Sequence, residues 1–176
     1  MSSRAAFAMA LVLVFPSSLP AQSPGSIQGV WRPVSRTIPA TTNPGDRSDP
    51  FAHVPIGTQT NLQPGLMIFT ARHYSRTTDT AMATRPATPE ATPGKPTVEE
   101  LLARWGPFQA NAGTYELSGS TLTLRLMVSK DPANQRRGTF ARLTVKMDGN
   151  RLWLTPIGNS AGRIVAGVTT EYVRVE

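Results

Sequence analysis

The side chains best suited to acid–base chemistry near neutral pH are the two histidines, His53 and His73. His73 is followed by Tyr74, so a cavity isomerase or hydrolase that uses this pair is one hypothesis for the chain. The sequence contains no H-E-x-x-H spacing, nucleophile elbow, phosphate-binding loop or dinucleotide fingerprint. We therefore expect both histidines to be solvated or packed in hairpins, and we predict neither a metal site nor a cofactor.

A second kind of candidate site is an apolar cavity for one small molecule, lined by the inward side chains of predicted strands and by a tryptophan of one predicted helix. Eight-stranded barrels either hold one such ligand or fill their interior with side chains, and the sequence leaves both alternatives open. The predicted ligand-binding residues are Phe69, Tyr74, Trp105, Tyr115, Leu124, Leu126, Leu143, Val145 and Leu154.

A third candidate is a basic surface, because the chain has 18 basic and 11 acidic residues and a formal net charge of +7. Basic side chains around an aromatic ring could bind single-stranded nucleic acid or an anionic surface of the cell envelope. We expect a solvated face with at most weak contact to such a surface and no nucleic-acid partner, and the oligomeric state stays open. The residues concerned are Arg125, Lys130, Arg136, Arg137, Arg142, Lys146 and Arg151, with Trp153 among them.

The elements that must position these side chains are mostly strands. Residues 26–38 are rich in β-branched residues, and Pro33 within them favours an edge strand or a bulge. Residues 39–64 are rich in Pro, Thr, Asn and Gly and are predicted to form a long loop. A last strand is predicted at residues 169–175.

Three hairpins are predicted between these ends, over residues 66–77, 114–128 and 139–155. The two longer hairpins turn at Gly119-Ser120 and at Gly149-Asn150; the second turn avoids two like charges opposite each other. Alternation then places Leu117, Leu122, Val128, Met147 and Leu152 on the inner face, beside the residues of the apolar cavity. The predicted cross-strand pairs are Phe69 with Tyr74, Tyr115 with Leu124, Leu117 with Leu122, and Asp148 with Arg151.

One short helix is predicted just before the first long hairpin. Thr97 is its N-cap, Glu100 completes a capping box, and Gly106-Pro107 ends it. The preceding Ala/Thr/Pro-rich residues 79–96 are predicted to form an extended loop, which could close one mouth of a barrel together with the helix. The helix carries an apolar stripe that we expect to pack against a larger element, formed by Val98, Leu101, Leu102 and Trp105.

Residues 1–23 are typical of a secretory signal peptide, with Arg4, an apolar run of eleven residues and a cleavage site after Ala21 or Ser23. The mature chain would be a single domain over residues 24–176. The absence of cysteine excludes a disulfide scaffold, a thiol nucleophile and a lipid-modified cysteine. We therefore predict an exported protein, periplasmic or secreted and bacterial, that is soluble after cleavage.

The number and pattern of strands predict a mostly β fold. We expect a small antiparallel up-and-down β-barrel of about eight strands with one short helix, because closure removes the edges that an open sheet would expose. The 14 glycines and 16 prolines fit this architecture, since many of them lie in the predicted turns and loops.

Several short motifs follow one another along nearly the whole mature chain, at residues 29–35, 65–70, 73–75, 105–108, 113–116, 148–154 and 172–174. In this order they resemble the bacterial lipocalin-like domain family. The resemblance implies a barrel around an apolar cavity, in which Trp31 of Gly29-Val30-Trp31 packs at the barrel base under Arg174. This role is structural, and because members of the family mostly lack an assigned activity, the resemblance implies a fold more than a function.

The first functional hypothesis from the sequence is an exported lipocalin-like barrel that binds a small apolar molecule in its interior. The alternatives are the cavity enzyme that uses His73 and Tyr74, and an envelope interaction module with a filled barrel and a basic outer face. A non-enzymatic role is favoured, because no catalytic motif accompanies the two candidate residues.

Overall fold

A computed structural model describes residues 26–40, 56–80, 96–162 and 167–176. The predicted signal peptide, His53 and most of the two predicted long loops lie outside the described residues. The elements in chain order are β1 (Gly29–Ile38), β2 (Gly57–Gln59), β3 (Gly65–Phe69), β4 (His73–Asp79), α1 (Val98–Trp105), β5 (Phe108–Ser118), β6 (Thr121–Ser129), the 3-10 helix η1 (Pro132–Gln135), β7 (Phe140–Asp148), β8 (Arg151–Asn159) and β9 (Thr169–Arg174).

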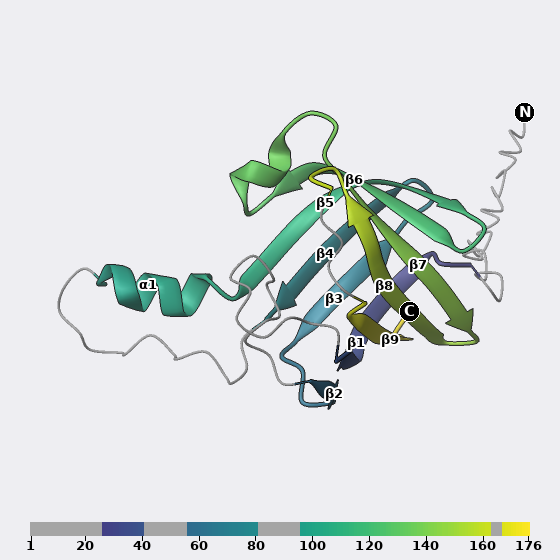
Figure 1. Cartoon of the computed structure of the whole chain (residues 1–176), viewed down its shortest axis with the longest axis horizontal. Coiled ribbons are helices and arrows are strands. Elements are labelled where there is room, and N and C mark those ends of the chain that lie inside the picture. Colours follow the sequence, from purple (N-terminus) through teal and green to yellow (C-terminus); the bar gives the residue numbers. More distant parts are fainter. Residues whose placement is uncertain (1–25, 41–55, 81–95, 163–166) are drawn as a thin grey trace, which may run out of the picture.

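Eight of these strands form a closed antiparallel barrel, as the sequence predicts. Strands β3 to β9 follow one another around the sheet, and β1 closes it by pairing with β3 on one edge and with β9 on the other (Figure 1). The ladder between β1 and β9 is interrupted between Pro33 and Ser35, so of the two alternatives that Pro33 favoured, an edge strand or a bulge, the structure has the bulge. Closure gives β9 a partner strand on both of its edges.

The prediction of an uninterrupted loop over residues 39–64 is wrong in its last part, because Gly57–Gln59 form the short strand β2. Strand β2 pairs with Arg36–Ile38, the end of β1 that extends past β3. Three residues without apolar alternation carry no recognisable strand signal, so the free edge of β1 decides their conformation.

The predicted hairpin registers are confirmed. Leu117 pairs with Leu122 and Ser118 with Thr121 across the Gly119-Ser120 turn. Asp148 pairs with Arg151, which establishes Gly149-Asn150 as the second turn. Phe69 faces Tyr74 across the hairpin of β3 and β4. Turn chemistry together with the need to bury one face was therefore enough to determine these registers.

A β-bulge in β6 corrects the inner face predicted for the first long hairpin. Leu126 pairs with Gly113 and Val128 with Ala112, so Met127 is an extra residue and the alternation reverses after it. Val128, predicted to point inward, is therefore 54% exposed, whereas the next residue, Ser129, is buried. Leu117, at the tip of the hairpin, is 37% exposed and contributes little to the core.

Trp31 closes one end of the barrel. Its side chain is fully buried, and its indole Nε1 donates a hydrogen bond to the carbonyl oxygen of Ile27 at 2.8 Å. The guanidinium carbon of Arg174 lies 4.2 Å from the centre of the indole ring, and its nitrogens donate to the carbonyl oxygens of Ser26 and Gln28. This is the contact that the sequence resemblance implies between the two residues, and it ties the start of the described chain to β9.

The core lies between this closed end and the middle of the barrel. Strand alternation points the inward residues of β3 to β9 at one another, and burial of their side chains is the main source of stability. The buried members are Ile27, Trp31, Met67, Phe69, Tyr74, Leu122, Leu124, Leu143, Leu152, Leu154 and Tyr172, with Tyr115, Ala141, Val145 and Met147 packed against them.

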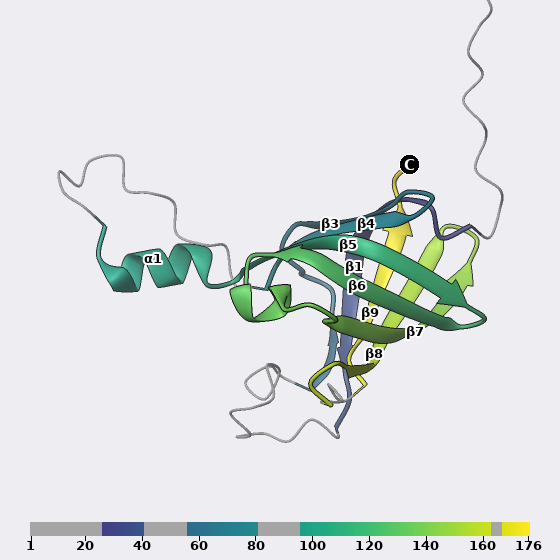
Figure 2. The same cartoon turned by 90° about the horizontal axis from the view of Figure 1, so that it is seen from above.

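Helix α1 forms where predicted but does not pack as predicted. Thr97 accepts a hydrogen bond from the amide of Glu100, and the Glu100 carboxylate accepts one from the amide of Thr97, so the capping box is confirmed. None of its residues is buried, and it projects away from the barrel in both views (Figures 1 and 2). The helices of the described part of the chain are too short or too polar to cross a bilayer.

We expect Arg174→Ala to lower the free energy of unfolding by about 2–4 kcal/mol, because it removes two charge-assisted hydrogen bonds and a cation–π contact at a buried ring. Arg125→Ala is the matched control, since it breaks an exposed ion pair with Glu116 and should cost at most about 1 kcal/mol. Urea denaturation measures both values. Equal losses for the two variants would contradict the role assigned to Arg174.

We expect Gly113→Ala to destabilise the fold by about 2–3 kcal/mol, because the added methyl group would collide with the carbonyl oxygen of Arg125 in the neighbouring strand. Gly158→Ala is the control, since a methyl group there meets no atom within 4 Å. Thermal unfolding of the two variants compares them directly. A Gly113→Ala protein as stable as Gly158→Ala would show that the bulge in β6 does not need a glycine.

Candidate ligand-binding site

Most of the residues predicted to line an apolar cavity come together in the barrel interior. Phe69, Tyr74, Leu124, Leu143 and Leu154 belong to the buried cluster, where each is at most 7% exposed. Two others, Tyr115 and Val145, pack against that cluster, and Leu126 is half-buried on the same inner face.

These apolar residues pack tightly against one another. The rings of Phe69 and Tyr115 meet edge to face with centroids 5.0 Å apart, and the Tyr115 hydroxyl donates to the carbonyl oxygen of Thr70 at 2.8 Å. Leu122 and Leu152 are fully buried beside them. Burial of these side chains against one another favours a filled core in the apolar half of the barrel, the second of the two alternatives that the sequence left open.

Trp105 is separate from the other predicted ligand residues. It is 59% exposed at the end of α1, where its ring contacts only Phe108 edge to face, at 6.4 Å between centroids, among the described aromatic rings. The ammonium group of Lys130 fixes the end of the helix by donating to the carbonyl oxygens of Trp105, Gly106 and Phe108. The expectation that the apolar stripe of α1 packs on a larger element is wrong for the described part of the chain.

The two candidate catalytic residues face opposite sides of β4. His73 is exposed, whereas the Tyr74 side chain is only 2% exposed and points into the core. Neighbouring residues of a strand alternate between faces, so this pair cannot converge on one reacting atom. Among the described residues, no three His, Cys, Asp or Glu side chains gather in the way that a metal site requires.

The inner face changes from apolar to polar toward the other end of the barrel. Arg76 of β4 pairs with Asn111 of β5, which in turn pairs with Ser129 of β6, so the three side chains form a polar row across adjacent strands. Arg36 of β1 faces the barrel from the other side and is only 8% exposed. Arg36 pairs with Thr170 of β9, and Thr170 pairs in turn with Leu154 of β8. Residues paired in this way share one face of the sheet, so Arg36 lies at the border of the apolar cluster, next to Leu154.

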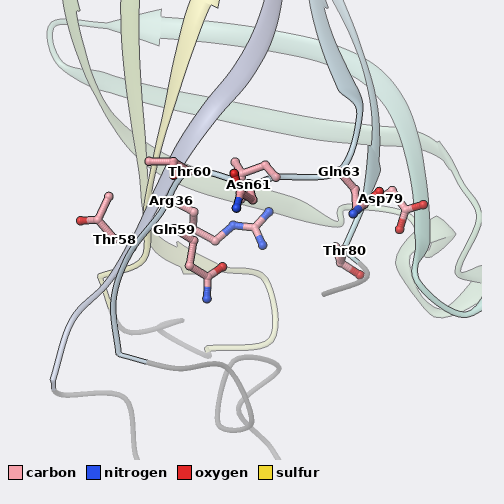
Figure 3. Close-up of a pocket in the computed structure, with 9 residues that line it drawn as sticks. Arg36, Thr58, Gln59, Thr60, Asn61, Gln63, Asp79 and Thr80 are labelled. Carbon is pink, nitrogen blue, oxygen red and sulfur yellow. The ribbon is translucent and has the colours of Figure 1, made fainter. Parts of the chain in front are cut away.

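A polar hollow of about 290 Å³ opens at this end of the barrel, which we call the polar end. Figure 3 shows the Arg36 side chain directed into it, between the side of Gln59 and Asn61 and the side of Gln63, Asp79 and Thr80. The residues that line the hollow are Arg36, Thr58, Gln59, Thr60, Asn61, Leu62, Gln63, Asp79 and Thr80.

The backbone of β1 explains why the hollow lies there. On the edge away from β9, β1 pairs with β3 only through Gly29–Trp31 and with β2 only through Arg36–Ile38. Residues 60–64, which connect β2 to β3, leave the ladder, and residues 60–63 form a wall of the hollow. Pro64, which has no amide hydrogen, and the bulge at Pro33 favour this break in the pairing.

Burial and charge both act on the groups near the polar end. Burial lowers the pKa of Arg36 from its ordinary value, and the positive charge of Arg76 lowers it further. Burial raises the pKa of Tyr74 to about 12, although Arg76 opposes this shift. The two guanidinium groups are therefore close enough to repel each other, and Arg76 also lies near the Tyr74 hydroxyl.

Sequence reasoning missed Arg36, Gln59 and Arg76 as site residues, because it selected apolar inward positions. One signal could have identified Arg76: if Tyr74 faces inward, the residue two positions later in the same strand does so too. For Arg36 the signal was ambiguous, because Pro33 favoured either an edge strand or a bulge, and only a bulge shifts the alternation that points Arg36 inward.

The predicted basic outer face consists largely of charges that have local partners. Arg125 lies 3.8 Å from Glu116, and Arg151 forms an ion pair with Glu171. The Lys146 ammonium lies 5.1 Å from the ring centre of Trp153, and the guanidinium of Arg142 lies 5.0 Å from that of Phe140. Contact with nucleic acid or with an envelope surface stays a matter for experiment.

Comparison of the chain with protein-family models and with curated protein sequences found no match in either case. The resemblance to the lipocalin-like domain family therefore stays a prediction that rests on the motifs of the chain itself.

We expect Tyr74 to titrate at about pH 12, so that the absorbance at 295 nm shows a late step that Tyr74→Phe removes. Because this pKa is higher in the folded than in the unfolded chain, the neutral phenol stabilises the fold below pH 10. That contribution is lost as the pH rises from about 10 to about 12. Because burial also raises the pKa of Tyr115, the test is the amplitude of the late step: an amplitude unchanged in Tyr74→Phe would contradict the burial of the Tyr74 hydroxyl.

Proposed function

We propose that this protein is an exported lipocalin-like binding protein that holds one small molecule at the polar end of its barrel. The apolar part of the molecule rests against the boundary of the core, which Tyr74 forms beside Arg76 and Leu154 forms beside Arg36. The observation that supports this proposal most directly is the hollow of about 290 Å³. It lies beside the buried Arg36, at the border of the apolar cluster. Pockets that combine apolar surface with a few convergent polar groups are typical small-molecule sites.

Two features of the chain support the wider assignment. The contact between Trp31 and Arg174 matches the arrangement that the family resemblance implies at the barrel base. Residues 1–23 have the pattern of a cleavable export signal, which is the basis for proposing a periplasmic or secreted location. The proposal moves the ligand from the apolar residues first considered, which pack as a core, to the polar end next to them.

The neutral fluorescent probe N-phenyl-1-naphthylamine tests this proposal with the full chain. We expect it to bind one site per barrel, and we expect Asn61→Trp to weaken binding by about tenfold or more, because the indole would occupy part of the hollow. The control is Thr144→Trp, which adds the same side chain at an exposed position of β7 and should leave the probe affinity unchanged.

Fluorescence titration gives both the stoichiometry and the affinity. Absence of saturable probe binding would contradict the proposed function. So would equal binding by Asn61→Trp and by the unmodified protein, because the probe would then occupy another part of the molecule.

A further inference from the structure

The polar end carries more positive than negative charge among its described side chains. Arg36 and the acidic residue Asp79 line the hollow, and Arg76, on the inner face of β4 opposite Asn111, is close enough for its charge to act on Arg36. With both guanidinium groups charged and one carboxylate nearby, the described groups sum to a net charge of about +1. A buried site of this kind favours a ligand with negative charge, because buried charges require compensation.

The hydrogen-bonding groups at this end point to the same kind of ligand. Three buried side-chain groups have no hydrogen-bond partner among the described residues: Nε of Arg76, Nε2 of Gln59 and the hydroxyl of Tyr74. Each of these groups can donate a hydrogen bond, and the first two can only donate. Buried donors without a partner are costly, so a ligand that offers several acceptor atoms would satisfy them together.

The positions of these donors connect them into one site. Gln59 pairs with Arg36 across β1 and β2, and both residues line the hollow. Arg76 lies two residues after Tyr74 on the same inner face of β4, and its charge acts on both Arg36 and Tyr74. The donors therefore extend from the wall of the hollow to the boundary of the apolar core.

From this arrangement we infer that the ligand of the barrel is an amphiphile whose anionic oxygen group, a carboxylate or a phosphate, is bound by Arg36 and Arg76. Gln59, in the wall of the hollow, and Tyr74, at the boundary of the apolar core, are further donors available to oxygen atoms of the ligand. This inference rests on the proposed function and adds to it the chemical class of the ligand. Guanidinium groups suit this role, because they form strong charge-assisted hydrogen bonds with both kinds of anion.

Competition against bound N-phenyl-1-naphthylamine tests the inference with four compounds that share one alkyl chain: octanoate, octyl phosphate, 1-octanol and octylammonium. We expect the two anions to displace the probe at concentrations about tenfold lower than 1-octanol, and octylammonium to be the weakest. In Arg76→Met this advantage of the anions should be lost, while Arg76→Lys should retain part of it. Arg142→Met, which removes a guanidinium from the outer face, is the matched control and should preserve it.

Binding of the neutral probe by Arg76→Met shows that this variant is folded and still has the proposed binding site. A failure of the inference about anions can then be distinguished from a failure of the proposed function. If the probe binds but 1-octanol competes as well as octanoate, or if Arg76→Met keeps the preference for anions, the inference is wrong. Acetate and inorganic phosphate distinguish the two sources of the anion. If only the octyl compounds compete, the anion is the headgroup of an amphiphile. If acetate or inorganic phosphate also competes, and does so only when Arg76 is present, the site binds a free anion.

Discussion

The pairing of β1 with three other strands is the constraint on which the rest of the structure depends. One edge of β1 pairs with β9 over residues 31–37, and this ladder closes the barrel. The other edge is divided between β3 near the start of β1 and β2 near its end. The parts of β1 that pair with β2 and with β3 are separated by four residues, so residues 60–64, which connect β2 to β3, are not paired with β1. The hollow forms beside this connection. Closure of the barrel and access to its interior thus follow from the hydrogen bonds of a single strand.

The two ends of the barrel differ in their chemistry. The closed end stabilises the fold, whereas the polar end is the proposed binding site. At the closed end, Arg174 covers a buried indole and satisfies two backbone carbonyl groups, so its charge is compensated by its surroundings. At the polar end, Arg36 and Arg76 repel each other, and several donors near them have no partner among the described residues. Such an arrangement weakens the fold and is typical of a site that a ligand completes.

Sequence reasoning predicted the barrel and its registers, because strand alternation and turn residues both depend on local sequence. Gly149-Asn150, for example, could be preferred from the charges of Asp148 and Arg151 alone. It could not predict the bulge at Met127, which depends on the close approach of Gly113 to its neighbouring strand, nor the pairing of β2, which depends on a free edge elsewhere. The site was missed for a related reason, since Arg36 becomes an inward residue only after the bulge at Pro33.

The most direct measurement of the central claim is the arginine Nε–Hε spectrum of the ¹⁵N-labelled protein during titration with octanoate. The account predicts that the Nε–Hε signals of Arg36 and Arg76, assigned by substitution, shift in a saturable manner and exchange more slowly with water. The outer arginines Arg125 and Arg142 should stay unchanged, and 1-octanol should produce a smaller effect on the two interior signals. Saturable shifts confined to the outer arginines, with Arg36 and Arg76 unaffected, would contradict the account.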